Sequence, residues 1–226
     1  MDSNNVKLSK LLFEYVDNID EFIKKLNSFS NKNIEEDDEA YNLFMDYITS
    51  NCTYISSGVS RMVYAVNDDL VIKVSQDSLH GQNKNEIKLS KCTENENPVL
   101  SKIFAYDETS FRWIIAERAL HTFESKEFQL KMLLGKLLDY ENIITLSFDA
   151  IRKILYGLLG GNDNMTKPFS DEIEFILSNP NKTTWFEDFI GLKQHCQFKT
   201  NDLHAENFGL MQDGRLAIID YGFVLF

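Results

Sequence analysis

Apolar side chains recur at helical spacing at the start of the chain and again through its second half. Residues 7–27 carry apolar positions on one helical face, with a break and a new N-cap at 17–20, and another helix is predicted around 41–48. Helical spacing returns after residue 117 in four segments, at residues 123–138, 143–159, 171–177 and 185–195. The chain therefore predicts helices on both sides of a differently patterned middle part.

That middle part consists of short apolar runs separated by turns. Strands are predicted at residues 54–55, 62–66, 70–74, 100–106 and 111–116, with a helix at 83–92. Hairpin-type turns within about 20 residues indicate an antiparallel sheet, and extended segments recur at 208–211 and 216–219. The pattern predicts an α+β protein: an N-terminal helical extension over 1–50, a five-stranded lobe over 51–118, and a helical lobe over 119–226.

Composition narrows the classes of partner. The 226 residues include 23 basic and 35 acidic side chains, which gives a formal charge of -12. An acidic surface disfavours sequence-independent binding to nucleic acid, which requires Lys and Arg to neutralise phosphates. No apolar run is long enough to span a bilayer and no basic-then-apolar leader begins the chain. We therefore expect a cytoplasmic protein that binds neither nucleic acid nor membrane.

The cysteines suggest no cross-link. Cys52, Cys92 and Cys196 are odd in number, and no CxxC pair or histidine cluster accompanies them. A disulfide framework or a zinc site is therefore not expected. The sequence predicts three unpaired thiols in a reducing cytoplasm.

Candidate chemistry gathers near the C-terminus. Asp202 and Asn207 flank a polar loop, and Asp220 follows the apolar run LAII. An Asp at the end of a buried strand is costly unless its charge is used. Two carboxylates and a carboxamide supply the hard oxygen ligands that Mg²⁺ prefers beside phosphate. The alternative is an ordinary capping Asp and a turn Asn, but the spacing between the two segments favours a metal site.

An upstream lysine and glutamate complement this site. Lys73 interrupts the apolar strand LVIKV, and Glu86 lies on the helix that follows. A strand lysine that pairs with a helix glutamate is oriented toward phosphates. The alternative places Lys73 on an edge strand with an exposed stem and Glu86 on the helix surface.

The turn between the first two predicted strands has the sequence SSGVSRMV, residues 56–63. A hairpin tip of small residues lets backbone N–H groups approach phosphate oxygens. Only Gly58 is a glycine, so a simple hairpin turn is the plainer interpretation of this segment alone.

The order of turn, strand lysine, helix glutamate, DLHAEN loop and DYG resembles the eukaryotic-type protein-kinase fold, over roughly residues 53–226. The resemblance implies a truncated two-lobed kinase-like fold. The matching positions are Ser56, Gly58 and Arg61 at the three glycines of the glycine-rich loop, Val63 at its valine, Lys73 and Glu86 at the ion pair, Asp202 and Asn207 in the catalytic loop, and Asp220 and Gly222 in the Asp-x-Gly motif.

The resemblance implies ATP and Mg²⁺ as cofactors and assigns roles. Adenine would lie against Val63, Val71 and a hinge that includes Glu117 and Ala119, with the triphosphate beneath Ser56 and Gly58. Lys73, held by Glu86, would contact phosphates, while Asn207 and Asp220 hold the metal. Asp202 would receive the proton of an acceptor hydroxyl. His204 would neutralise the γ-phosphate in place of the family's lysine, although an ordinary hydrogen-bonded loop histidine is an equal alternative.

Two departures from the family leave several functions open. Thr200 and Asn201 replace the His and Arg that precede the catalytic Asp, and the chain ends four residues after Gly222, so no activation segment is expected. Such a minimal kinase resembles those encoded by bacteriophages, which implies a serine/threonine kinase acting on host proteins. The alternatives are a kinase-shaped protein that inhibits a host target by binding, and a small-molecule phosphotransferase of the aminoglycoside or choline kinase type.

Overall fold

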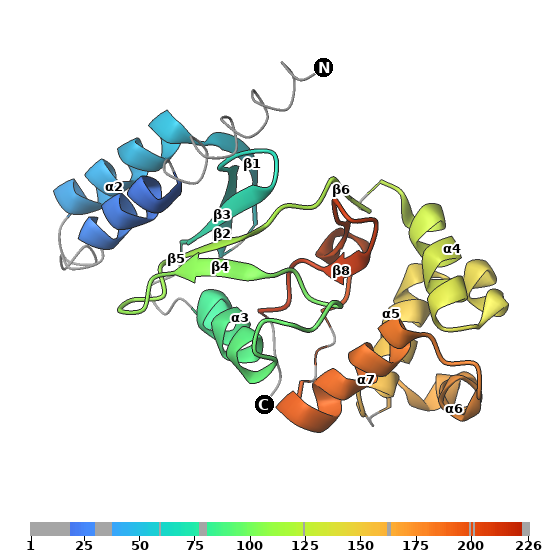
Figure 1. Cartoon of the computed structure of the whole chain (residues 1–226). Coiled ribbons are helices and arrows are strands. Elements are labelled where there is room, and N and C mark those ends of the chain that lie inside the picture. The colour runs from blue at the N-terminus through green and yellow to red at the C-terminus, as the bar shows by residue number, and fades with distance from the viewer. Residues whose placement is uncertain are drawn as a thin grey trace, which may run out of the picture.

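The computed structural model describes residues 19–29, 38–58, 60–76, 81–123, 125–161, 164–198, 200 and 202–222. Within them, a sheet covered by helices forms one part and a group of helices forms the other (Figure 1). The predicted α+β class is confirmed. The helix predicted for residues 7–16 lies outside the described residues.

The main sheet has five antiparallel strands in the order β1-β2-β3-β5-β4. The strands are β1 Thr53–Ser57, β2 Arg61–Ala65, β3 Leu70–Ser75, β4 Ile103–Tyr106 and β5 Trp113–Glu117. β3 is central and almost entirely buried, which explains why its sequence is a nearly continuous apolar run. The five strands predicted from the sequence are all present, with slightly different ends.

Alternate residues of the central strand face different helices. Ile72 and Val74 pack with helical residues 19–29 and with α2 (Asp38–Asn51) in one cluster. Val71 packs on the other side with Ile87 of α3 (Gly81–Cys92). Figure 1 shows α2 and α3 on opposite sides of the sheet. The described N-terminal helices therefore cover one face of the five-stranded sheet.

The helical part is built on a second, larger core. Its helices are α4 Glu127–Leu137, η1 Glu141–Thr145, α5 Phe148–Leu158, η2 Lys167–Phe169, α6 Ser170–Ser178 and α7 Thr184–Cys196. The side chains of Ser147 and Thr183 accept hydrogen bonds from backbone N–H groups in the first turns of α5 and α7, as N-cap residues do. Trp185 donates from its indole nitrogen to the Leu216 carbonyl at 2.8 Å, which joins α7 to the C-terminal hairpin.

A small second sheet carries the C-terminal hairpin. It pairs β6 His121–Thr122 with β7 Phe208–Leu210 and β8 Leu216–Ile218, all antiparallel. The short η3 helix Ala205–Asn207 precedes β7. The sequence predicts helix immediately after residue 117 and misses β6, because two residues carry no readable period. This hairpin places Asp220 two residues after the last residue of the buried strand β8, close to the strand end that the sequence predicts.

The cysteine prediction is wrong for two of the three thiols. Cys92 and Cys196 form a disulfide across a sequence separation of 104 residues, with their Cα atoms 5.8 Å apart. The two residues end α3 and α7, and these helix ends meet only through the tertiary fold. Cys52 remains a free thiol. The spacing of cysteines along the chain does not show which helix ends lie close together in the fold. This disulfide between the two parts could therefore not be predicted from the sequence.

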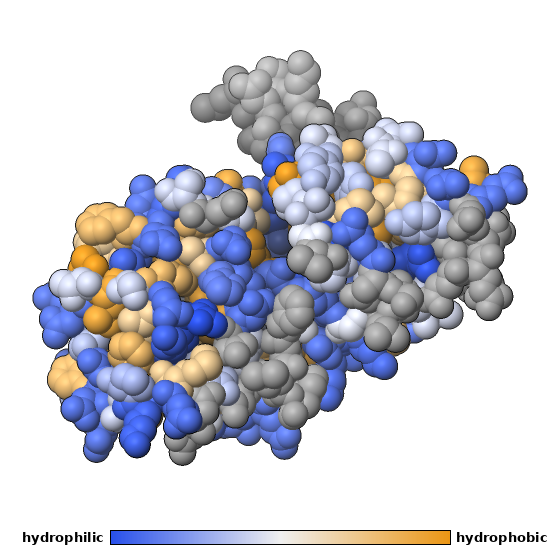
Figure 2. Space-filling model, turned by 180° about the vertical axis from the view of Figure 1, so that it is seen from behind, coloured by the Kyte–Doolittle hydropathy of each residue, from blue (hydrophilic) through white to orange (hydrophobic). Residues whose placement is uncertain are grey.

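The face of the molecule seen in Figure 2 is mostly polar. Seen from behind, both parts are largely hydrophilic, and apolar side chains gather over the helical part on the left of the view (Figure 2). None of the helices in the described ranges has the length and apolarity to cross a bilayer.

Candidate active site

Lys73 and Glu86 form a buried ion pair. The Lys73 ammonium lies 2.8 Å from Glu86 Oε2, and their side chains are 6% and 0% exposed. β3 supplies the lysine from the centre of the sheet, and the first turns of α3 supply the glutamate. The structure thus brings together the pair predicted from sequence order and excludes the two surface positions offered as alternatives.

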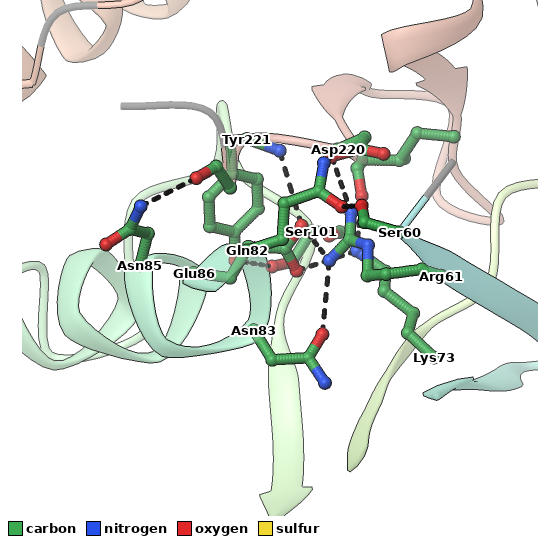
Figure 3. Close-up of polar contacts among 12 residues, drawn as sticks. Ser60, Arg61, Lys73, Gln82, Asn83, Asn85, Glu86, Ser101, Asp220 and Tyr221 are labelled. Carbon is green, nitrogen blue, oxygen red and sulfur yellow. Dashed lines mark hydrogen bonds and ion pairs between the residues drawn. The ribbon is translucent and has the colours of Figure 1, made fainter. Parts of the chain in front are cut away.

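A second cation, Arg61, joins this pair from the start of β2. One guanidinium nitrogen lies 2.7 Å from Glu86 Oε1, and the other lies 2.5 Å from Asp220 Oδ1 (Figure 3). The Arg61 side chain is only 4% exposed. From the sequence, Arg61 is matched only to a glycine position of the turn. The available signal was an arginine heading a strand whose other residues, Met62 to Ala65, carry no charge.

The C-terminal loop meets the same cluster through its backbone. Lys73 donates to the Ile219 carbonyl at 2.5 Å, directly before Asp220. The Asn207 side-chain amide donates to the Asp220 carbonyl at 3.1 Å, and the Ile219 N–H donates to the Asn207 carbonyl at 2.7 Å. Asn207 and Asp220 therefore lie side by side, as the sequence predicts for two metal ligands.

The DYG segment docks on the polar face of α3. Asn85 donates to the Gly222 carbonyl at 2.9 Å, and the Tyr221 N–H donates to Glu86 Oε1 at 3.4 Å. A Cβ atom on Gly222 would stand 2.6 Å from the Gln82 carbonyl oxygen. Glycine is required here because the backbone of α3 passes too close for any side chain.

Charge and burial set the protonation of this cluster. Burial lowers the pKa of Lys73, and Arg61 acts in the same direction, whereas Glu86 and Asp220 oppose them. Burial alone would raise the pKa of Asp220, but the charges of Arg61 and Lys73 outweigh burial and hold this pKa below its ordinary value. Although burial opposes it, the two carboxylates keep the pKa of Arg61 raised. At neutral pH, Asp220 is a carboxylate facing a guanidinium.

Asp202 lies close enough to this cluster to feel the charge of Asp220. Its pKa is raised, first by burial and also by the charge of Asp220, while His204 and Arg152 act in the opposite direction. His204 Nε2 lies 3.2 Å from Asp202 Oδ1. The Asp202 and His204 side chains are 32% and 48% exposed, so solvent reaches both. A carboxylate with a raised pKa suits proton acceptance.

The residues predicted to contact adenine lie in two different places. Val63 and Val71 both belong to the cluster between the sheet and α3. Glu117 ends β5, where its carboxylate is bonded to Arg215 and its N–H donates to the Lys102 carbonyl at 2.9 Å. Ala119 follows and packs near Gly209 of β7. The segment passes between the two sheets, but the Glu117 side chain is already engaged by an arginine.

The structure does not bring Ser56 and Gly58 into the charged cluster. Both are exposed, and the open space around Gly58 would admit a Cβ atom without contact. The turn is instead tied to α3 by Ser60, whose hydroxyl donates to the Gln82 side-chain oxygen. The contact with the cluster therefore comes from Ser60 and Arg61, at the second half of the turn.

The donor set suits a cation that arrives with phosphate. Asp220 and Asn207 supply oxygen ligands of the type Mg²⁺ prefers, and Mg²⁺ commonly takes only one or two protein ligands beside phosphate and water. Within the described ranges, no three His, Cys, Asp or Glu side chains cluster closely enough to form a self-sufficient metal site. The residues present therefore fit Mg²⁺ bound together with a nucleotide.

Comparison with known proteins gives structural neighbours only. No family model matches the chain, and neither does any curated protein. Among solved structures, the streptomycin–ATP complex of APH(2″)-IIa shares 19% identity and a TM-score of 0.36, with 80% of this chain and 70% of that one covered. The gentamicin complex of APH(2″)-IIa shares 20% identity and a TM-score of 0.36, with 82% of this chain and 70% of that one covered. ADP-bound aminoglycoside phosphotransferase APH(2″)-Ib shares 19% identity and a TM-score of 0.36, with 80% of this chain and 70% of that one covered. A likeness at this level assigns no function.

Proposed function

We propose that this protein is an ATP-dependent phosphotransferase. The observation that carries the proposal is the convergence of a buried lysine–glutamate pair with Asp220 and Asn207, which come from the opposite end of the chain. Phosphoryl transfer from a nucleoside triphosphate requires a lysine that is oriented by a carboxylate and contacts the phosphates. It also requires oxygen ligands nearby that bind the metal ion. The match with the kinase motifs of the sequence supports the same conclusion.

The contacts support the following roles. Lys73 would bind phosphate oxygens while Glu86 orients its ammonium, and Asn207 with Asp220 would hold the cation. Bound Mg²⁺–ATP would supply the phosphoryl group and neutralise its developing charge. Asp202 would orient the acceptor hydroxyl and take its proton, with His204 beside it. These residues mainly position the reactants, which is the larger part of catalysis in phosphoryl transfer.

We further propose a serine or threonine hydroxyl of a protein as the acceptor. Asp202 and His204 stand partly exposed at the surface, where a macromolecule can reach them. This openness favours a protein acceptor over an enclosed small molecule. The resemblance to bacteriophage kinases makes host cytoplasmic proteins the first candidates.

Incubation with [γ-³²P]ATP, Mg²⁺ and a bacterial lysate tests both levels of the proposal. Labelled protein bands are expected from the natural chain, and Asp202→Ala should reduce labelling at least about 100-fold, as loss of an acid–base group does. Asp213→Ala is the matched control, because Asp213 lies in the exposed β7–β8 turn. ATP should raise the melting temperature of both variants.

Three other results would redirect the assignment. Labelled metabolites without labelled proteins would replace the protein acceptor by a small molecule. ATP binding without any transfer would indicate a kinase-shaped binding protein. Absence of ATP binding would reject the phosphotransferase altogether.

A further inference from the structure

Arg61 occupies an unusual position for a strand residue. It begins β2, is 4% exposed, and uses different guanidinium nitrogens for Glu86 and Asp220. Asn83 adds a third contact, at 3.4 Å from its side-chain oxygen, and Asn83 is itself held by the carbonyls of Phe111 and Arg112. A planar guanidinium can bridge two carboxylates in this way, whereas an ammonium acts as a point charge.

Arg61 also completes the charge balance of the cluster. Glu86 and Asp220 bring two negative charges, while Lys73 and Arg61 bring two positive ones. Lys73 is already paired with Glu86 through Oε2, so Arg61 is the direct counter-charge of Asp220. A carboxylate beside a second buried carboxylate is unfavourable without such a partner. The two carboxylates and the two cations thus balance one another in number within the cluster.

We propose that Arg61 is a positioning residue that neutralises Asp220 in the nucleotide-free protein and competes with the divalent cation for that carboxylate. The inference rests on the proposed function, since it takes Asp220 as the metal ligand. The fork of Arg61 allows one nitrogen to stay on Glu86 while the other leaves Asp220 Oδ1. The cation then takes over the counter-charge, and Glu86 keeps its orientation throughout.

Competition between Arg61 and the cation predicts how the affinity for the cation changes when Arg61 is replaced. If the cation weakens the Arg61–Asp220 pair, Arg61 must weaken cation binding by the same factor. Removing the guanidinium should therefore tighten cation binding to the nucleotide-free protein. A purely structural arginine predicts the opposite, because its loss would loosen the site and weaken binding.

Mn²⁺ alone is the probe, with free Mn²⁺ measured by electron paramagnetic resonance at increasing protein concentration. Arg61→Gln should bind Mn²⁺ about tenfold more tightly than the natural chain, within the range usual for coupled sites. The gain should disappear in the double variant Arg61→Gln/Asp220→Asn. Arg112→Gln is the matched control, because Arg112 is also a buried arginine of the small lobe and its guanidinium lies over the Tyr41 ring.

Each outcome decides the matter. Equal or weaker Mn²⁺ binding by Arg61→Gln, or no measurable binding by any variant, overturns the inference. If Arg61→Gln does not fold, Arg61→Lys is measured instead. This variant keeps the positive charge but loses the forked guanidinium, so a smaller increase in Mn²⁺ affinity is expected. No increase in affinity would refute competition. ATP-induced thermal stabilisation of the natural chain is measured separately. Tighter Mn²⁺ binding by the variant without ATP binding by the natural chain would reject only the phosphotransferase.

Discussion

The cluster around Glu86 depends on which side chain reaches which oxygen. Lys73 contacts Oε2 and Arg61 contacts Oε1, so both oxygens of one fully buried carboxylate are used by cations from neighbouring strands. Lys73 is paired in register with Val63, and Arg61 with Ser75. Since β2 and β3 are adjacent, their registers fix both cations relative to α3. The main sheet therefore fixes the two cations, and the C-terminal loop brings Asp220 to them.

The pH dependence of transfer should report on Asp202. The carboxylate must be ionised to take a proton, so the rate rises with pH through its pKa, which lies above the ordinary value of about 3.8. His204 lowers this pKa, and Asp202 loses that effect in His204→Gln. The acid limb of kcat/KM should therefore move to higher pH in His204→Gln. An unmoved limb, or one displaced to lower pH, would contradict the assignment of Asp202 as the proton acceptor.

Single functional residues can be predicted from the sequence only when they differ from their neighbours along the chain. Lys73 could be predicted because a lysine interrupts an apolar run, and Asp220 because it follows one. Arg61 could not be predicted in this way, because the motif assigns its position to a loop glycine. Its burial depends on the approach of α3 and of the C-terminal loop, which are 25 and 159 residues further along the chain, at Glu86 and Asp220.

Among the elements, α3 is the one on which the site is built. Its buried face carries Gln82, Asn83 and Glu86, which are polar, beside Ile87 and Leu89. Buried polar side chains require partners, and here they find them in the turn before β2, in the residue that precedes β5 and in the DYG segment. Periodicity predicts this helix but not its polar buried face, because hydrophobic pattern alone assigns such residues to solvent.

Substitutions at two motif glycines test how closely the DYG segment packs on α3. Gly222→Ala should lower the free energy of unfolding by about 1–3 kcal/mol, the usual cost of overpacking, because the new Cβ would meet the Gln82 backbone. It should also weaken ATP binding, since Asp220 and Tyr221 must shift with it. Urea denaturation and ATP-dependent melting measure the two effects.

Gly58→Ala is the control at the other motif glycine. No atom lies within 4 Å of its added Cβ, so stability should stay within about 0.5 kcal/mol, as for most surface changes. Equal destabilisation by the two variants would show that the packing of DYG on α3 is not what makes Gly222 necessary.

Across the whole molecule, contacts near the site and away from it hold the lobes together. Near the site, Lys73 and Arg61 bind the C-terminal loop. Further away, the last residue of α3 is bonded covalently to the last residue of α7. The sequence predicts the lobes and most of their elements, since these follow from local periods. It does not predict the disulfide, since only the packed arrangement brings Cys92 to Cys196.

The cross-link should make a large contribution to global stability. A bond that closes a loop of about 100 residues restricts the unfolded chain strongly, and its removal costs about 2–5 kcal/mol. The 104-residue separation of Cys92 and Cys196 places it in this class. Cys196→Ser should therefore unfold at lower urea concentration than the natural chain in oxidising buffer. Reductant should lower the natural chain to the level of the variant and leave the variant unchanged.

Cys52→Ser separates this effect from the mere loss of a thiol. Cys52 is free and packs against the cluster between α2 and the sheet, so its change should have a small effect that is independent of reductant. If reductant destabilises all three proteins equally, the loss comes from something other than the Cys92–Cys196 bond. If it destabilises none of them, the two parts are held by their noncovalent contacts. Only a reductant effect confined to the chains that retain both cysteines agrees with a covalent connection between α3 and α7.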